Sequence, residues 1–239
     1  MDFIALISGG KDSIYTTNLL IDKGYNLRGL VYIYCKSDNL DSYMYQTVGK
    51  EMINIYSECF NVPIFVKESD CLTINKDMNY VPTENDEVED LYKILKDLPI
   101  KYDAVSSGAI LSSYQKNRVD SVCKRLQKQS LAPLFNKNQL ELLKEMIDYK
   151  IQAVVIKVAG VGRNFMFKGL NDLYEYYKDK PQFNACGEGG EYETIVLDSP
   201  HFIKKIEILE HEIFVHPEEV NKKENTFYAK INKFITINK

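Results

Sequence analysis

Apolar and polar residues alternate along the first half of the chain with two periods, one typical of buried strands and one of amphipathic helices. Short apolar runs predict strands, and apolar residues spaced three and four apart predict helices between them. The predicted strands are 3–7, 27–34, 62–66 and 103–107, and the predicted helices are 14–23, 45–60, 87–98 and 114–128. Such regular alternation predicts a parallel sheet covered by helices on both faces.

The pattern changes after a break in composition at residues 127–133. The second half carries a predicted helix, a predicted strand, a glycine-punctuated stretch and two period-two runs, at 139–149, 151–158, 160–168, 204–215 and 227–237. A change from alternating strands and helices to β-rich sequence indicates a second unit. We therefore expect an α/β protein, with a parallel-sheet domain over residues 1–130 and a smaller C-terminal α+β domain over residues 131–239.

The composition narrows the class of protein without naming a function. Of 239 residues, 45% are hydrophobic and 27% charged, and the formal net charge is −4, which is ordinary for a globular protein and offers no nucleic-acid-binding tail. No run approaches the ~18 apolar residues of a membrane span, and Asp2 stands where a signal peptide carries positive charge, so we expect a cytoplasmic protein. The cysteines lack CxxC spacing, so we expect buried thiols rather than disulfides or a zinc site; they are Cys35, Cys59, Cys71, Cys123 and Cys186.

The stretch "LISGGKDS" at residues 6–13 directly follows the first predicted strand. Ligands of open α/β sheets bind outside the carboxyl ends of the strands, where a helix N-terminus favours anions. Gly9 and Gly10 let several backbone N–H groups approach one phosphate, Lys11 adds a positive charge, and Ser8 and Ser13 supply hydroxyls. The alternative interpretation is a glycine turn that caps a helix. The position between a strand and a helix favours a nucleotide-binding loop.

Asp12 makes this loop distinctive, because a carboxylate beside a phosphate is unfavourable unless a cation lies between them. We therefore expect Asp12 to hold Mg²⁺. The loop is not a Walker A motif, which needs Ser or Thr where Asp12 stands, and it contains no GxGxxG dinucleotide fingerprint. "SGGKDS" instead resembles the PP-loop of ATP pyrophosphatases. That resemblance implies ATP as cofactor, cleavage between its α- and β-phosphates, adenylation of a substrate oxygen, and catalytic roles for Lys11 and Asp12.

Four further stretches narrow the resemblance to one family. They are "LDSYMYQTVG" (40–49), "NDEVEDLY" (85–92), "GAILSSYQKNRVDSVCKRL" (108–126) and "CGEGGEYET" (186–194). With the loop, they resemble the diphthine–ammonia ligase (diphthamide synthetase) family. The resemblance implies amidation of the carboxylate of diphthine, a modified histidine on translation elongation factor 2, by ammonium and ATP through an acyl-adenylate, with release of AMP and pyrophosphate. It also implies a HUP-type (adenine nucleotide alpha hydrolase-like) nucleotide-binding domain, and a substrate-binding second domain carrying "EGGE".

Glu188, Glu191 and Glu193 place three carboxylates within six residues. If residues 191–197 form a strand, Glu191 and Glu193 share one face and Tyr192 takes the other. Carboxylates this close favour a cation, which leaves Mg²⁺, ammonium and the trimethylammonium group of diphthine as candidates; solvated glutamates in a turn are the alternative. We favour ammonium handling by at least one of the three, and expect Glu191→Gln to block amide formation while ATP–pyrophosphate exchange continues. The substrate-binding residues implied within this stretch are Gly189, Gly190 and Tyr192.

The remaining candidate residues lie in two of the other stretches. Gly108 allows close approach to the nucleotide, while Gln115 and Arg118 lie three apart on a predicted helix and can face one ligand. Arg118 is a candidate anchor for phosphate or for the substrate carboxylate. Tyr45 and Gln46 are expected to reach toward the same cleft and contact the substrate.

Three rival functions remain to be weighed. A PP-loop enzyme that modifies tRNA, of the thiolation or lysidine type, is the first alternative, although paired cysteines are absent and an acidic chain suits tRNA poorly. A glutamine-dependent amidotransferase needs an N-terminal nucleophilic cysteine, and residue 2 is Asp. A nucleotide-binding module without catalysis would not need Lys11 and the "EGGE" carboxylates together. We expect a protein substrate and ammonium as partners, and neither a membrane nor direct contact with nucleic acid.

Overall fold

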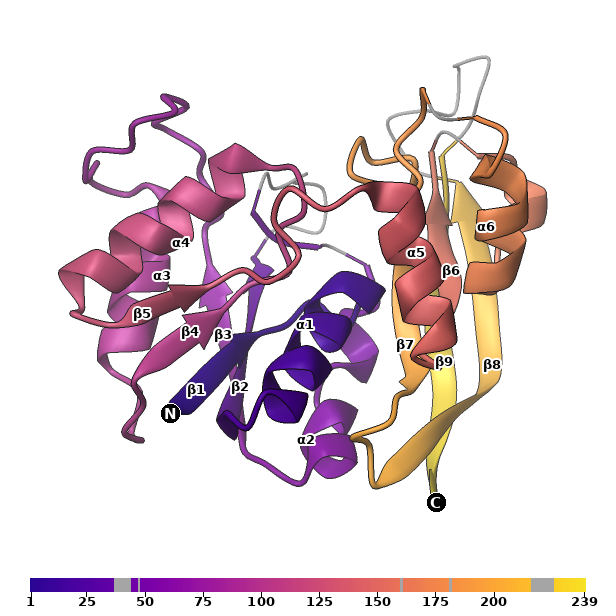
Figure 1. Cartoon of the computed structure of the whole chain (residues 1–239), viewed down its shortest axis with the longest axis horizontal. Coiled ribbons are helices and arrows are strands. Elements are labelled where there is room, and N and C mark those ends of the chain that lie inside the picture. Colours follow the sequence, from indigo (N-terminus) through magenta and orange to yellow (C-terminus); the bar gives the residue numbers. More distant parts are fainter. Residues whose placement is uncertain (37–43, 47, 160, 181, 216–225) are drawn as a thin grey trace.

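Two β-sheets lie side by side in the computed structural model of the chain, with helices between and around them (Figure 1). The structure describes residues 1–239 except 37–43, 47, 160, 181 and 216–225. Among the described residues, no helix is long and apolar enough to cross a membrane. Residues 40–43 and 47 of the "LDSYMYQTVG" stretch lie outside this description.

The first sheet is parallel, as the alternating pattern of the N-terminal half predicts. Its order is β3-β2-β1-β4-β5, so the direction in which strands are added reverses between β1 and β4. The strands are β1 (Asp2–Leu6), β2 (Asn26–Cys35), β3 (Ile64–Ser69), β4 (Ala104–Ser106) and β5 (Gln129–Leu131). In such a sheet, the crevice for a ligand forms at the carboxyl ends of the two strands that flank the reversal.

Helices cover both faces of this sheet, because successive side chains of each strand point to opposite faces. In β1, Phe3 and Ala5 pack in one core with side chains of α1 and α2, whereas Ile4 packs in a second core with α3 and α4. The helices are α1 (Lys11–Asp22), α2 (Ile55–Phe60), α3 (Glu87–Lys96) and α4 (Ser113–Arg125). Burial on both sides explains why these strands read as continuous apolar runs.

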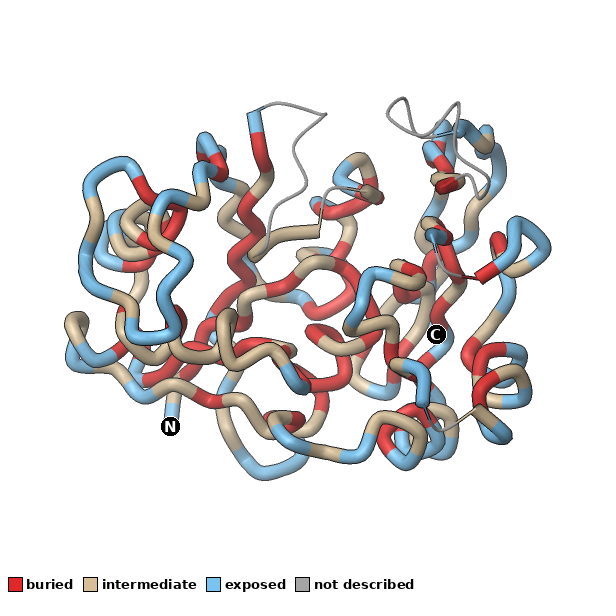
Figure 2. Tube along the Cα trace, turned by 90° about the horizontal axis from the view of Figure 1, so that it is seen from above, coloured by how far each residue is buried: buried red, intermediate tan, exposed pale blue. Residues whose placement is uncertain are grey.

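The second sheet is antiparallel, with order β7-β6-β9-β8. Its strands are β6 (Gln152–Val158), β7 (Tyr192–Asp198), β8 (Lys204–Val215) and β9 (Phe227–Asn238), and its helices are α5 (Gln139–Asp148) and α6 (Leu170–Tyr177). Helices α1 and α2 lie between the two sheets (Figure 1). One core cluster therefore contains buried side chains from both halves of the chain, and the buried trace continues through the middle of the molecule (Figure 2).

The expected helix over residues 45–60 is wrong for most of its length. Only Ile55–Phe60 is α-helical, preceded by the short 3₁₀ helix η1 (Lys50–Met52). Gly49 has φ 80°, a left-handed conformation that interrupts a helix. The sequence pattern also missed two elements: β5, which lies inside the expected break at 127–133, and α6, which follows the glycine-punctuated stretch and the 3₁₀ helix η2 (Arg163–Phe165).

The expectation that the cysteines are buried thiols is wrong for one pair. Cys35 and Cys71 form a disulfide, with Cα atoms 5.4 Å apart. Strands β2 and β3 are parallel neighbours in which Cys35 lies opposite Ser69, so their carboxyl ends bring together two cysteines 36 positions apart in sequence. That proximity comes from strand pairing and leaves no local spacing signal. Cys59, Cys123 and Cys186 are buried free thiols.

Candidate active site

The "SGGKDS" loop lies at the carboxyl end of β1, where it meets the loop that follows β4. This is the position at which the strand order reverses. A Cβ atom at Gly108 would lie 2.8 Å from Ser13 N and 2.9 Å from the carbonyl carbon of Asp12. Only glycine allows the two backbones to come this close, so the structure brings Gly108 to the "SGGKDS" loop, which we call the nucleotide loop after its predicted ligand.

The loop is shaped by the hydroxyls of its two serines. The Ser8 N–H donates to Ser13 Oγ at 3.2 Å, and the Gly10 N–H donates to Ser8 Oγ at 3.2 Å. Ser13 Oγ in turn donates to the Gly10 carbonyl at 3.1 Å. Gly9 adopts φ 84°, which favours glycine. These bonds fix the turn from β1 into α1. The N-terminus of α1, which carries the positive end of the helix dipole, lies at Lys11.

Strand β7 of the second sheet braces the same loop. The Val196 N–H donates to the Gly9 carbonyl at 2.9 Å, and the Lys11 N–H donates to Thr194 Oγ1 at 3.1 Å. The buried Tyr56 hydroxyl lies 3.1 Å from the Gly9 carbonyl oxygen and 2.8 Å from that of Val196. The nucleotide loop is therefore a contact between the two halves of the chain as well as the end of a strand.

The Lys11 side chain is buried, with 2% of the residue exposed, and its ammonium group contacts the second half of the chain. Nζ donates to Asp12 Oδ2 at 2.9 Å and to the Cys186 carbonyl at 2.5 Å, and it lies 5.0 Å from the centre of the Tyr192 ring. Burial alone lowers the pKa of Lys11, but the neighbouring Asp12 and Glu188 carboxylates outweigh it and raise the pKa. Lys11 thus stays protonated through neutral pH.

Asp12 has one carboxylate oxygen to spare. Oδ2 accepts from Lys11, whereas Oδ1 is buried and has no hydrogen-bond partner among the described residues. An unpaired carboxylate oxygen beside a phosphate-binding loop fits a ligand of Mg²⁺. Within the described ranges, no three His, Cys, Asp or Glu side chains lie together in a way that could hold a metal ion. The hydroxyls of Ser106 and Ser107, at the end of β4, are also buried without a described partner, and the sequence analysis missed them.

The three glutamates of the "EGGE" stretch have different surroundings. Glu188 reaches the first half of the chain, where its Oε2 accepts from the Leu111 N–H at 2.9 Å, and burial raises its pKa. Glu193 pairs with Lys157 at 2.9 Å, and its Oε2 is buried without a partner in the described part of the chain.

Glu191 turns back into its own loop. Its carboxylate accepts from Asn184 Nδ2 and from the Gly189 N–H, both at 2.9 Å. Strand β7 begins one residue later, at Tyr192, so Glu191 and Glu193 do not share a strand face as expected. The structure separates them because the glutamate at 191 closes the turn that Gly189 and Gly190 make.

Gln139, the first residue of α5, organises this loop and was missed by the sequence analysis. Its Oε1 accepts from the Cys186 N–H, and its Nε2 donates to Asn184 Oδ1, both at 2.9 Å. Asn184 then donates to Glu191. A chain of hydrogen bonds thus runs from α5 to the loop whose Cys186 carbonyl receives Lys11. Because Gln139 lies far from either motif in sequence, no spacing signal pointed to it.

Two domain models of one protein family match the chain. A family model described as "Diphthamide synthase N-terminal domain" matches residues 1–130, and one described as "Diphthamide synthase C-terminal domain" matches residues 138–225. The chain belongs to the diphthamide synthase family.

Curated relatives carry the name "Diphthine--ammonia ligase". The relative from Homo sapiens is 43% identical over 229 residues, covering 90% of this chain and 86% of its own length. The relative from Schizosaccharomyces pombe is 40% identical over 226 residues, and the match covers 90% of this chain but 37% of that longer protein. This chain thus spans little more than a third of the length of the fission-yeast relative. A solved structure of a predicted subunit of tRNA methyltransferase from Methanocaldococcus jannaschii aligns with 83% of this chain and 99% of its own, at 17% identity and a TM-score of 0.44, a likeness too low to carry an argument.

Gln46 lies at the nucleotide loop, and Tyr45 points to α3. Gln46 Nε2 donates to the Thr194 carbonyl at 3.4 Å, and its Oε1 would lie 3.0 Å from a Cβ at Gly10. The Tyr45 hydroxyl donates to the Glu87 carbonyl at 3.3 Å. Their roles in substrate binding stay predictions, with Gln46 the better placed of the two.

Arg118 lies fully buried on α4 and directs its donors at backbone carbonyls. Its guanidinium donates to the carbonyls of Asn75 at 2.6 Å and Asp77 at 3.3 Å, and its Cζ lies 3.2 Å from the centre of the Tyr114 ring. These contacts hold a neighbouring segment of chain, so the structure does not bring Arg118 to the nucleotide loop. Gln115 lies in the first turn of the same helix, where its N–H donates to the Ser112 hydroxyl at 3.2 Å. Anchoring of substrate by either residue stays a prediction.

Proposed function

We propose that this protein is a diphthine–ammonia ligase that amidates diphthine on translation elongation factor 2, using ammonium and ATP and releasing AMP and pyrophosphate. The observation that carries the proposal is the buried contact between the nucleotide loop and the "EGGE" loop, made by Lys11 and the Cys186 carbonyl. It supports one site built from both family motifs, in which a nucleotide and a second substrate meet.

The chemistry requires activation of a carboxylate, which is a poor electrophile. A diphthine oxygen attacks the α-phosphorus of ATP, the bond between the α- and β-phosphates breaks, and pyrophosphate leaves. Ammonia then attacks the carbonyl carbon of the acyl-adenylate, and AMP leaves. The Lys11 ammonium and the N-terminus of α1 would stabilise negative charge on the phosphates, where loss of one donor typically costs ~10²–10³ in rate.

Asp12 is our candidate for holding Mg²⁺ in this site. Its buried Oδ1 has no described partner, and Mg²⁺ prefers such oxygen ligands. The ion would neutralise charge on the departing pyrophosphate.

Of the three glutamates, Glu188 is the best placed to handle ammonium. It interacts electrostatically with both Lys11 and Asp12, whereas Glu191 is engaged in its own loop and Glu193 with Lys157. At neutral pH ammonia is present mostly as the ammonium ion, which must lose one proton before its nitrogen can attack. A half-buried carboxylate can attract the ion and accept that proton.

The test is an assay of AMP release with diphthine-bearing elongation factor 2, with and without ammonium. We expect turnover only with both present. Lys11→Met should lower AMP formation about 10²–10³-fold, with Lys23→Met on the exposed end of α1 as matched control. Glu188→Gln should block amide formation while ATP–pyrophosphate exchange continues.

Three results would contradict the proposal. Release of ADP and orthophosphate would exclude adenylation, and stimulation of AMP release by tRNA instead of the elongation factor would favour a tRNA-modifying enzyme. Turnover of Lys11→Met equal to that of the wild type would remove Lys11 from the mechanism.

A further inference from the structure

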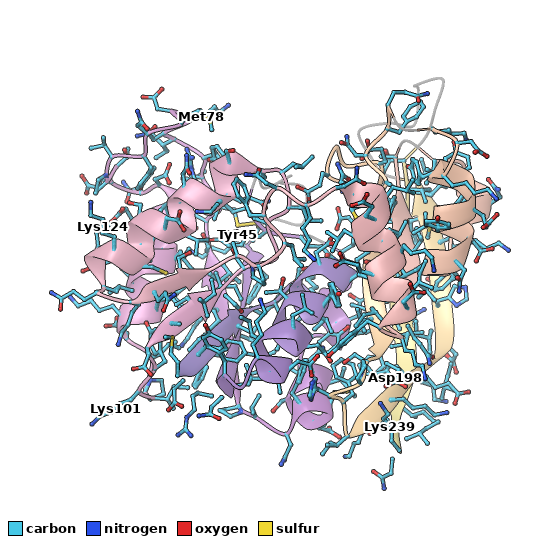
Figure 3. All side chains as sticks on the ribbon, viewed as in Figure 1. Tyr45, Met78, Lys101, Lys124, Asp198 and Lys239 are labelled. Carbon is cyan, nitrogen blue, oxygen red and sulfur yellow. A yellow bond between two sulfur atoms is a disulfide. The ribbon has the colours of Figure 1, made fainter. Side chains whose placement is uncertain are left out.

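Residues 72–81, between β3 and α3, expose a cluster of large apolar side chains. Leu72, Ile74, Met78 and Val81 are 45%, 51%, 52% and 64% exposed. They make up four of the twelve exposed large apolar residues in the described part of the chain, within ten positions. We call residues 72–81 the apolar segment. Met78 marks its place at the edge of the molecule beyond α4 (Figure 3).

The apolar segment has no helix or strand, yet its backbone is tightly held at its start. Cys71 ties its first residue to the end of β2 through the disulfide with Cys35. The buried Asp86 carboxylate accepts from the N–H groups of Ile74 at 3.0 Å and Asn75 at 2.9 Å, and also caps α3. A buried carboxylate with this many amide donors fixes the chain that it binds.

Arg118 holds the middle of the same segment. Its guanidinium donates to the carbonyls of Asn75 and Asp77, and its Cζ lies 5.4 Å from the centre of the Tyr80 ring and 3.2 Å from that of Tyr114. Asn117, next on α4, donates from Nδ2 to the Met78 carbonyl at 3.1 Å. Because the segment is fixed through its backbone, the positions from which its exposed apolar side chains project are fixed. Such preorganisation lowers the entropic cost of binding a partner.

The apolar segment is continuous with the candidate active site through the N-terminal turn of α4. Thr73 Oγ1 donates to Glu87 Oε1 at 2.9 Å, and the Tyr114 hydroxyl lies 3.4 Å from the same oxygen. Three residues before Tyr114 comes Leu111, whose side chain is 48% exposed and whose N–H binds Glu188. A partner lying on the segment and on Leu111 therefore reaches the edge of the active site.

The charge of this surface indicates the chemistry of the partner. The exposed charged residues of the stretch from 72 to 84 are one lysine and two acids, Lys76, Asp77 and Glu84, for a net charge of −1. Nucleic acids and anionic membranes need clustered cations, which this surface lacks. An exposed apolar cluster of balanced charge suits the surface of a folded protein.

We propose that the apolar segment and Leu111 form the surface on which the enzyme docks the folded protein that carries diphthine. The proposal rests on the proposed function, since it needs a protein substrate. It assigns recognition of that protein to the first domain, at a distance from the residues that bind the nucleotide. Substitution of two of these side chains should weaken the complex about tenfold, which corresponds to about 1.4 kcal/mol of lost apolar burial.

The test measures the dissociation constant between the enzyme and diphthine-bearing elongation factor 2, without ATP or ammonium. The double variant Ile74→Ser/Val81→Ser removes two apolar side chains and keeps the backbone bonds that anchor the segment. Leu209→Ser/Ile235→Ser, on β8 and β9, is the matched control, because these residues are 43% and 42% exposed and lie in the other sheet. Met78→Ser is a milder single variant should the double one fail to fold.

We expect the dissociation constant to rise about tenfold for Ile74→Ser/Val81→Ser, to rise in the same direction for Met78→Ser, and to stay within about twofold for the control. Equal affinities of the segment variants and the wild type, or absence of any complex with the wild type, would each overturn the docking surface. The same holds if the wild type binds anionic vesicles and the segment variants lose that binding while their affinity for the elongation factor is unchanged. Because binding is measured without ATP, an enzyme that binds the protein but does not amidate it refutes the proposed function and leaves the docking surface standing. If the wild type amidates the protein and the segment variants bind it with unchanged affinity, the proposed function stands and the docking surface is refuted.

Discussion

At the scale of single residues, Gly108 shows how tightly the site is assembled. Because Gly108 has no side chain, the backbone of Asp12 and Ser13 can pack against it. A Cβ at this position would lie 2.8 to 2.9 Å from their backbone atoms, which is too close. The atoms it would meet are main-chain atoms of the nucleotide loop, which cannot rotate aside as the end of a flexible side chain could.

We therefore expect Gly108→Ala to push the nucleotide loop away from β4 and to raise the dissociation constant for ATP at least tenfold. Gly169→Ala is the matched control, because a Cβ there meets only Asp172 Oδ2 at 3.8 Å and the Ala153 carbonyl at 3.9 Å, at ordinary contact distance. Calorimetric titration with a non-hydrolysable ATP analogue measures both. Equal affinities of the two variants would contradict a close approach of the loops.

How far the sequence reveals single residues depends on whether their partners are local. The serines and glycines of residues 8–13 could be assigned to a phosphate-binding loop because the loop closes on itself. Gln139 could not be assigned, because its partners Asn184 and Cys186 are more than forty positions away. Glu191 would share a strand face with Glu193 only if the strand began at residue 191; β7 begins one residue later, and the Glu191 side chain turns into the loop.

At the scale of elements, α3 and α4 are linked by a two-pronged ion pair. Arg125 Nη1 and Nη2 donate to Glu89 Oε1 and Oε2, both at 2.7 Å, and the Tyr80 hydroxyl donates to Glu89 Oε1 at 3.0 Å. The hydrogen bonds from Arg125 hold the pKa of Glu89 below its ordinary value. The helix pair therefore carries a stabilising contact that depends on the ionised carboxylate.

A lowered pKa in the folded state stabilises the protein above the ordinary pKa of Glu89, and this contribution is lost as pH falls through the folded value. We expect Glu89→Gln to lower the free energy of unfolding by about 1 kcal/mol at neutral pH and by much less near about pH 3. Urea denaturation at both pH values measures the difference, with Glu58→Gln, at an exposed pair, as control. A deficit that is equal at the two pH values would show that the carboxylate charge does not contribute.

Most of the elements of the first half could be predicted, because the central strands β1 and β4 and most of β2 are buried on both faces and most helices have one apolar side. The helix expected over residues 45–60 fails because period alone does not register the left-handed Gly49. Strand β5 has three residues and α6 eight, too short for a period to stand out from the loops around them. The disulfide follows from the pairing of β2 with β3, which the order of the strands along the chain does not give.

At the scale of the whole molecule, the two halves share a core and a loop. Side chains of α1 and α2 pack in one cluster with those of β6, β7 and α5. The Thr194 hydroxyl and the Val196 N–H satisfy backbone groups of Lys11 and Gly9. Removing the second half would expose the apolar side of both helices and leave the nucleotide loop without these partners.

We expect a fragment of residues 1–130 to bind ATP at least a hundredfold more weakly than the full chain, and to show exposed apolar surface by dye binding. Co-expression with residues 131–239 should restore both properties if the halves associate as they pack in the full chain. ATP affinity of the isolated fragment equal to that of the full chain would contradict the bracing of the loop by β7. The matched control is Thr194→Val, which removes one of the bracing groups and should weaken ATP binding less than truncation does.

The bracing of residues 9–11 also limits what a protein engineer can transplant. Lys11 and Thr194 are 183 positions apart, yet they meet in one hydrogen bond. A cassette cut from the first strand and helix would carry the glycines and serines into a host sheet without the strand that locks them. In this chain the loop depends on β7 for its backbone partners, so a functional graft must include both the loop and that strand.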